Sequence, residues 1–218
     1  VFVGTQIQET HKPEHVFTFE NALMGYRELL RTERFLASAL TTAFQTAVFF
    51  AMMGFIAYSF ERMSISPKEF GVWMATTSVG YVIGNLANKR LLKRYQIEII
   101  TLVGAIASLT SLLLMGIWYN AAPNSPTGLA IPMFLVGLSN GVIIANSIII
   151  ASSALPRLRG SATGLVGAMQ MGAGGISGTA AIWLGADQNT HVGIFTLIVI
   201  SFCSLLSAWW SSKLERPQ

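Results

Sequence analysis

Residues 160–185 read GSATGLVGAMQMGAGGISGTAAIWLG, a stretch with eight glycines and no charged side chain. In a soluble helix each glycine costs about 1 kcal/mol relative to alanine. In a bilayer the backbone has no water to bond to, so the helix persists. Small residues four apart allow close helix contact, and the pairs here are Gly160/Gly164, Ala168/Gly172 and Gly174/Gly178. The stretch predicts a tightly packed transmembrane helix with Gln170 near its midpoint, beside a polar cavity. The alternative, a glycine-rich soluble loop, is disfavoured by the Leu, Val, Ile, Met and Trp residues between the glycines.

The composition of the whole chain is that of a membrane protein. Of 218 residues, 52% are hydrophobic and 11% are charged, whereas soluble domains have about 25% charged residues. The net charge of +4 comes from short cationic runs between apolar stretches. This pattern is typical of cytoplasmic loops rather than of a nucleic-acid-binding surface, so we expect no nucleic-acid partner. The chain lacks an initiator Met and residues 1–4 are apolar, so we expect a piece of a longer protein.

Six stretches are long enough to cross a hydrocarbon core of about 30 Å. We expect an all-α membrane protein whose six-transmembrane-helix bundle covers 35–212, with spans at about 35–60, 68–92, 97–119, 129–155, 160–185 and 192–211. Ser66-Pro67 predicts the N-cap and first residue of the second span. Residues 1–34 would hold the end of a preceding helix and a cytoplasmic linker. Phe19, Leu23, Tyr26 and Leu30 recur there at helical spacing, which fits either an interfacial amphipathic helix or a solvated linker.

The cations are distributed unevenly over the two sides of this arrangement. Twelve of the 14 Lys and Arg residues fall on one side, and only Arg62 and Lys68 fall on the other. Because cytoplasmic loops are enriched in Lys and Arg, both termini, including a tail at 213–218, should be cytoplasmic. We expect an integral protein of a bacterial inner membrane.

The spans contain polar side chains but no deep ionisable one. We therefore expect no enzyme, no cofactor and no metal site, and no proton relay within this stretch. Gln45, Asn140 and Gln170 fall near the midpoints of three spans, where an amide bonds another helix or faces a shared polar chamber. Thr41, Gln45, Phe49 and Met52 share one helical face. That face predicts either a cavity for an amphipathic aromatic ligand or ordinary helix packing.

A basic run closes the second span. Gly80, Gly84 and Ala87 permit close helix contact, and the run Gly84-Asn85-Leu-Ala-Asn-Lys89-Arg90 ends at the membrane face. The run is either a plain cytoplasmic loop or a gate latch, whose cations pair with acidic groups or helix C-termini in one conformation only.

These residues resemble a known family. The turn after the second span is similar to the degenerate second copy of the motif between helices two and three of the major facilitator superfamily, and Arg159-Gly160 resembles the Arg-Gly of the matching loop. Finer features resemble the bicyclomycin/chloramphenicol-resistance group of drug:proton antiporters. Gln8-Glu9-Thr10 resembles the Pro-Glu-Thr that follows helix six of that group, with Gln8 in place of the proline. Residues 26–35 resemble its entry into helix seven, and residues 66–71 and 84–90 resemble its entry into and exit from helix eight.

The resemblance implies that the six spans are helices seven to twelve of a twelve-helix transporter, with spans one, two, four and five lining a central cavity. It also implies that the proton-carrying acidic residues lie in a missing N-terminal six-helix half. The function expected is proton-coupled export of small amphipathic drugs, by rocking of this bundle against its partner. The alternatives are transport of a polar metabolite, such as a sugar or nucleoside, and a stand-alone six-helix scaffold or channel.

Overall fold

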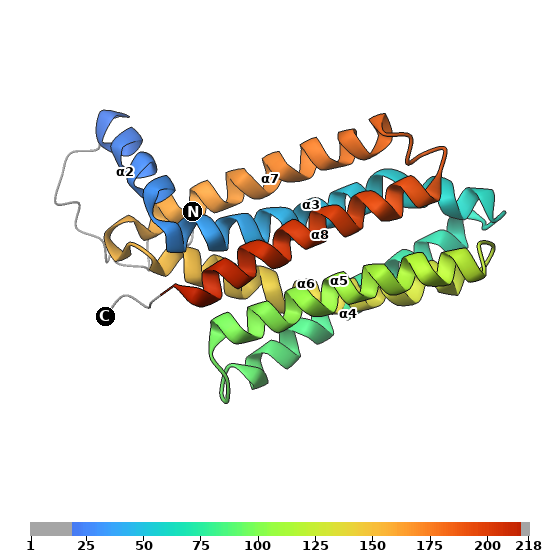
Figure 1. The fold of residues 1–218 in the computed structure, drawn as a ribbon, viewed down its shortest axis with the longest axis horizontal. Coiled ribbons are helices and arrows are strands. Elements are labelled where there is room, and N and C mark those ends of the chain that lie inside the picture. Colours follow the sequence, from blue (N-terminus) through green and yellow to red (C-terminus); the bar gives the residue numbers. More distant parts are fainter. Residues whose placement is uncertain (1–18, 215–218) are drawn as a thin grey trace, which may run out of the picture.

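The computed structural model describes residues 19–214 as an all-helical bundle, with no strand among these residues (Figure 1). The α-helices are α2 (Phe19–Arg31), α3 (Glu33–Arg62), α4 (Pro67–Leu91), α5 (Ile97–Ala121), α6 (Pro126–Ser153), α7 (Arg159–Trp183) and α8 (Thr190–Lys213), with a short 3₁₀ helix η1 (Pro156–Leu158). The predicted end of an earlier span, the Gln8-Glu9-Thr10 motif and most of the predicted tail lie outside the described residues.

Each of the six predicted spans is a helix, from α3 to α8, and its ends differ from the predicted ones by no more than three residues. Four of them, α3, α5, α6 and α8, are long and apolar enough to cross a membrane. The other two, α4 and α7, have 25 residues each, about 37 Å at 1.5 Å per residue, which exceeds a core of about 30 Å. They are too polar or glycine-rich to qualify by composition, so the six-span count stays a prediction.

Two central helices, α3 and α6, organise the bundle. Helix α3 packs against α7 and α8, helix α6 packs against α4 and α5, and the two pack against each other (Figure 1). Large side chains with no exposed surface fill the space where these groups meet, among them Met52, Phe55, Phe60, Leu112 and Met133. An apolar core of this kind fixes α3 and α6 as the frame on which the outer helices lie.

The tightest helix contact lies between α4 and α6, because glycines on both helices bring the two backbones together. A Cβ atom at Gly80 would collide with the Phe134 carbonyl, and one at Gly84 with the Leu138 carbonyl. In return, Gly137 and Gly141 leave room for the backbone of α4 at residues 77–85. Such small-residue contacts let helices approach closely inside a membrane.

The predicted helix at 160–185 packs along α3, but only part of its glycines lie in close contact with a described neighbour, and the tight packing of its other face stays a prediction. A Cβ atom at Gly174 would meet the Phe50 ring at 2.7 Å, and Gly178 lies against α3 near Gly54. Nothing described lies within 4 Å of the Cβ positions at Gly160, Gly164 or Gly172. Small residues four apart allow another helix to approach, but they do not show that one is there. No described helix covers the face of α7 that carries Gly160, Gly164 and Gly172.

Polar contacts close the two ends of the bundle. At the end that carries α2 and the α4–α5 turn, Arg34 and Glu98 form an ion pair of 2.7 Å between α3 and α5, and both side chains are largely buried. At the other end, Arg62 donates to the Asp187 carbonyl and to Thr190 Oγ1, which ties α3 to the α7–α8 connection. These contacts hold α3 in register with its neighbours.

The start of α4 forms as its sequence predicts. Ser66 is the N-cap, Pro67 is the first helical residue, and Ser66 and Glu69 form a reciprocal capping box. This pairing satisfies two backbone N–H groups that a helix start leaves without a partner.

The predicted amphipathic segment is the helix α2, which leaves the bundle at an angle (Figure 1). Leu29 is fully buried, while Leu23, Tyr26 and Leu30 are exposed.

Candidate functional site

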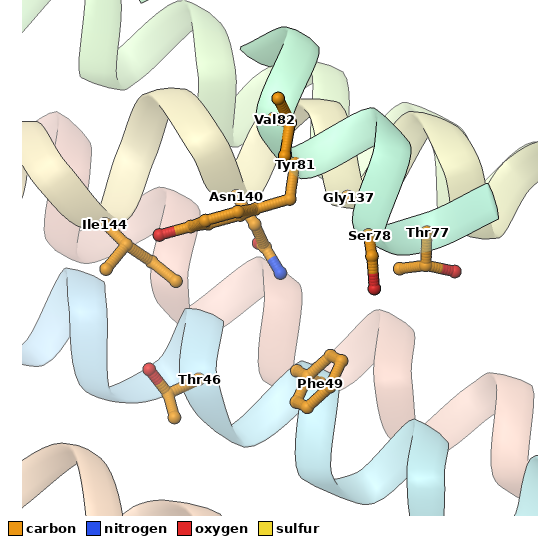
Figure 2. A pocket seen from close by; sticks show the side chains of 9 residues that line it. All are labelled: Thr46, Phe49, Thr77, Ser78, Tyr81, Val82, Gly137, Asn140 and Ile144. Atoms are coloured by element: carbon orange, nitrogen blue, oxygen red, sulfur yellow. The ribbon is translucent and has the colours of Figure 1, made fainter. Parts of the chain in front are cut away.

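A pocket of about 360 Å³ lies between α3, α4 and α6 (Figure 2). It is lined by Thr46, Phe49, Thr77, Ser78, Tyr81, Val82, Gly137, Asn140 and Ile144. These residues fall around the midpoints of all three helices, since α3 runs 33–62, α4 runs 67–91 and α6 runs 126–153. The pocket therefore sits halfway along the bundle, at the depth where the middle of a bilayer would lie.

The close packing of α4 on α6 positions the walls of the pocket. Gly137 lets the α4 backbone at Thr77 approach, which places Tyr81 beside Asn140. Figure 2 shows the Tyr81 ring extending along α6 toward Ile144, with Phe49 and Thr46 facing it from α3. Phe49 is 36% exposed and packs edge-on against Phe50. The rings of Phe49 on α3 and Tyr81 on α4 thus face the same pocket.

A buried amide cluster supports the wall of the pocket at Asn140. The Gln45 side chain has no exposed surface, and its Nε2 donates to Asn140 Oδ1 and to Ser108 Oγ, each at 2.6 Å. These bonds orient the Asn140 amide, and Figure 2 shows its nitrogen directed toward the space between Thr46 and Phe49. Thr77 Oγ1 is buried and has no hydrogen-bond partner among the described residues. The Asn140 amide is thus a polar group that a ligand could bond, whereas Thr77 Oγ1 is enclosed and points away from the space in front of Asn140.

A second amide contacts the same wall from α7. Gln170 Nε2 donates to Thr42 Oγ1 at 2.9 Å and to Thr46 Oγ1 at 3.1 Å. Because Thr46 lines the pocket, Gln170 is one hydrogen bond away from it. Of the three amides predicted at the midplane, Gln45 and Asn140 are hydrogen-bonded to each other. Gln170 bonds neither of them and instead donates to two threonines of α3.

The structure brings together part of the predicted cavity set. Phe49 and Asn140 line the pocket, while Gln45 and Gln170 bond residues of its wall. Thr41 and Met52 face the interior: Thr41 Oγ1 donates to the Ala37 carbonyl at 2.8 Å, and Met52 belongs to the apolar core. The reason is geometric. At about 100° per residue, Phe49 lies about 80° around α3 from Thr41 and about 60° from Met52.

Helix α4 contributes pocket residues that the sequence did not single out. Thr77, Ser78 and Tyr81 line the pocket, yet the second span was interpreted only through its glycines and terminal cations. The available signal was the polar run 76–78, in the middle of a predicted span, followed by a tyrosine. Asn88 belongs to the run 84–90 that the sequence singled out, but its partner was not predicted. It exchanges two hydrogen bonds with Asn146, at 2.8 and 3.0 Å, and both side chains are buried.

The residues predicted to act in gating lie at the end of the bundle that carries most of the cations. Lys89 and Arg90 are exposed in the last turn of α4, and Asn85 Nδ2 donates to the Tyr81 carbonyl at 2.9 Å. Arg159 and Gly160 begin α7 and are exposed. Among the side chains of residues 23–214, no carboxylate forms an ion pair with Lys89 or Arg90. The gating role of these residues stays a prediction.

The pocket offers binding groups but no acid–base pair. Its lining contains two aromatic rings, hydroxyl groups and one amide, and Tyr81 is its only ionisable residue. The described part of the chain contains no cluster of three or more His, Cys, Asp or Glu side chains that could hold a metal ion. A mostly apolar pocket with a few fixed polar groups is typical of small-molecule binding.

Comparison with known families identifies the chain. The sequence model of the Major Facilitator Superfamily matches residues 35–218, which covers α3 to α8 and most of the chain. The chain belongs to the major facilitator superfamily. A comparison with curated protein sequences finds no match. Members of this superfamily are membrane transporters of small solutes rather than enzymes, which accounts for a neutral pocket in a helical bundle with several apolar helices.

Proposed function

We propose that this chain is the C-terminal six-helix half of a secondary transporter that exports small amphipathic molecules in exchange for protons. In this proposal α3 to α8 are helices seven to twelve, and the pocket between α3, α4 and α6 is one wall of the substrate site. The bundle rocks against an N-terminal partner half, so that the site opens alternately to the two sides of the membrane.

The position and chemistry of the pocket carry this proposal. Secondary transporters bind their substrates near the bilayer midplane, and the lining residues lie around the midpoints of α3, α4 and α6. Phe49 and Tyr81 provide ring surfaces for an aromatic or cationic ligand. Asn140, Thr46 and Ser78 offer hydrogen bonds. An uncharged pocket of this kind suits a molecule with a large apolar part and one or two polar groups.

An uncovered face of α7 supports the proposal that a second helical bundle packs against this one. Gly164 and Gly172 have nothing described within 4 Å of their Cβ positions, and Met171 and Ile176 on the same helix are highly exposed. Small residues on an uncovered helix face are suited to contact with another membrane helix. We assign this face to helices of the N-terminal half.

The proposal also includes orientation and coupling. The described cations cluster at the end of the bundle with α2, the α4–α5 turn, η1 and the end of α8 (Figure 1). This distribution favours cytoplasmic termini in a bacterial inner membrane. In this proposal the proton-carrying acidic residue belongs to the N-terminal half, as the family resemblance implies. A pocket that no Asp, Glu, Lys, Arg or His lines is consistent with this assignment.

Drug accumulation in cells that express the intact protein tests the proposal. We expect lower accumulation of a hydrophobic cationic dye such as ethidium, and loss of this effect when a protonophore collapses the proton gradient. Phe49→Ala and Tyr81→Ala should each reduce efflux several-fold, because each removes an aromatic contact of about 0.5–1.5 kcal/mol together with buried apolar area. Phe195→Ala is the matched control, since Phe195 is an exposed aromatic on α8, away from the pocket.

Two outcomes would contradict parts of the proposal. Unchanged efflux in a stably expressed Gln45→Ala/Gln170→Ala variant would show that these two amides do not contribute to the substrate site. Dye accumulation that is insensitive to the protein, together with uptake of a radiolabelled sugar or nucleoside, would replace drug export by transport of a polar metabolite.

A further inference from the structure

A second hollow of about 350 Å³ lies between α4, α5 and α6. Its α6 residues Leu138, Ser139 and Val142 alternate along the helix with the pocket residues Gly137 and Asn140, and it shares no lining residue with the pocket. We call it the outer groove. Its walls include Leu91, Tyr95, Ile99, Val103, Ala107 and Val142. Ile99 and Val103 are 48% and 58% exposed, so the groove is open to its surroundings.

The topology explains why the groove exists. Helices α4 and α5 are consecutive and joined by a short turn, and both pack extensively on α6 while hardly touching each other. They diverge from the turn as two walls, and α6 forms the floor. The floor residue Ser139 donates its hydroxyl to the Leu135 carbonyl at 2.9 Å, so it presents no free donor to the groove. The surface of the groove is suited to a hydrocarbon chain.

Four cations stand at one end of the groove. Leu91 and Tyr95 line it, and the turn between them contains Lys93 and Arg94, which follow Lys89 and Arg90 at the end of α4. All four cations are exposed, and no described carboxylate between residues 23 and 214 forms an ion pair with any of them. An apolar groove therefore begins beside a concentration of exposed positive charge, which complements an anionic group.

We infer that the outer groove binds one anionic phospholipid, with an acyl chain along α5 and the headgroup phosphate on the cations at 89–94. Basic sites beside transmembrane helices on the cytoplasmic side bind anionic headgroups, and each cation near the membrane surface strengthens binding about fivefold. The inference rests on the proposed membrane placement of the bundle and not on the transported substrate.

Photo-crosslinking of the intact protein in nanodiscs tests this inference. The probes are phosphatidylglycerol and phosphatidylcholine with the same diazirine-bearing acyl chain, at trace level in unlabelled phosphatidylcholine. Mass spectrometry measures the label on peptides that cover 91–107, relative to the label around Val199 and Phe202 on α8. These two residues are exposed and lie at the middle of their helix, so they report ordinary lipid contact.

We expect phosphatidylglycerol to label 91–107 at least about fivefold more than phosphatidylcholine does, after division by the α8 label. K93Q/R94Q should reduce this preference by about fivefold or more. K213Q, which removes a cation at the end of α8, should leave it unchanged. Ala107→Trp should reduce the phosphatidylglycerol label on 91–107 toward the level of ordinary lipid contact, because the exposed Ala107 lines the groove and a large ring would occupy part of it.

Equal labelling by the two lipids, or a K93Q/R94Q variant that behaves like K213Q, would overturn the inference. So would full labelling of 91–107 in Ala107→Trp, because the acyl chain would then lie elsewhere. These results are independent of the transport assays. A protein that labels as expected but exports nothing would retain the lipid site and lose the proposed function.

Discussion

Replacement of Gly84 by alanine tests the contact on which the pocket depends. A Cβ atom at this position would collide with the carbonyl oxygen of Leu138, and the carbonyl carbon and Cα of the same residue lie within 3.2 Å. All three are backbone atoms inside α6, so no side-chain rotation can relieve the clash. The added methyl group has to push α4 and α6 apart.

The size of the effect follows from the cost of overpacking. Insertion of one extra carbon into a well-packed contact destabilises a protein by about 1–3 kcal/mol, and the higher helix propensity of alanine offsets up to about 1 kcal/mol of this. We expect Gly84→Ala to reduce the free energy of unfolding by about 1–2 kcal/mol. It should also weaken dye efflux, since Thr77 and Tyr81 reach the pocket from the displaced helix.

Gly71→Ala is the matched control, because Gly71 lies on the same helix and has nothing within 4 Å of its Cβ position. This variant should be unchanged or stabilised by up to about 1 kcal/mol. Reversible unfolding of the intact protein by sodium dodecyl sulfate in mixed micelles measures the free energy of unfolding of both variants. A Gly84→Ala variant within about 0.5 kcal/mol of Gly71→Ala would refute the backbone contact between α4 and α6.

Three further predictions use the same unfolding measurement. Asn88→Leu should cost about 1–3 kcal/mol because it leaves the buried amide of Asn146 unpaired, and the double variant with Asn146→Leu should cost about 1 kcal/mol less than the sum of the single variants. Additive effects would contradict the amide pair. Ser66→Ala should cost about 1 kcal/mol and Ser66→Thr much less, because only alanine removes the oxygen that caps Glu69 N–H; equal losses would argue against the cap. Gly164→Leu should destabilise the intact protein if the N-terminal half covers α7, whereas an unchanged stability would place that face against lipid.

The helices and their ends were largely predictable because their signals are local. Apolar length, the Ser66-Pro67 start and the cationic ends are read within a few residues, and the structure places helices at all six predicted ranges. Among the candidate site residues, the sequence indicated Phe49 and Asn140, because a polar or aromatic side chain near the middle of a span is conspicuous.

The partners of these residues were not predictable. Nothing near Gln45 in the chain indicates that it bonds Asn140, 95 residues later, or that Tyr81 faces Phe49 across a pocket. The glycines show this most clearly. The glycine-rich helix 160–185 has most of its glycines facing open space. In contrast, Gly84 and Gly137, in less glycine-rich helices, lie directly against the facing backbone at Leu138 and at Thr77.

The sequence by itself determined that this chain forms long apolar helices with charged ends, since the hydrophobic effect and backbone hydrogen bonding act on each segment separately. Only the tertiary structure decided which faces meet, because helix packing depends on the complementary shapes of two distant surfaces. The pocket between α3, α4 and α6 and the outer groove both arise from that choice: α4 lies against α6 and away from α5.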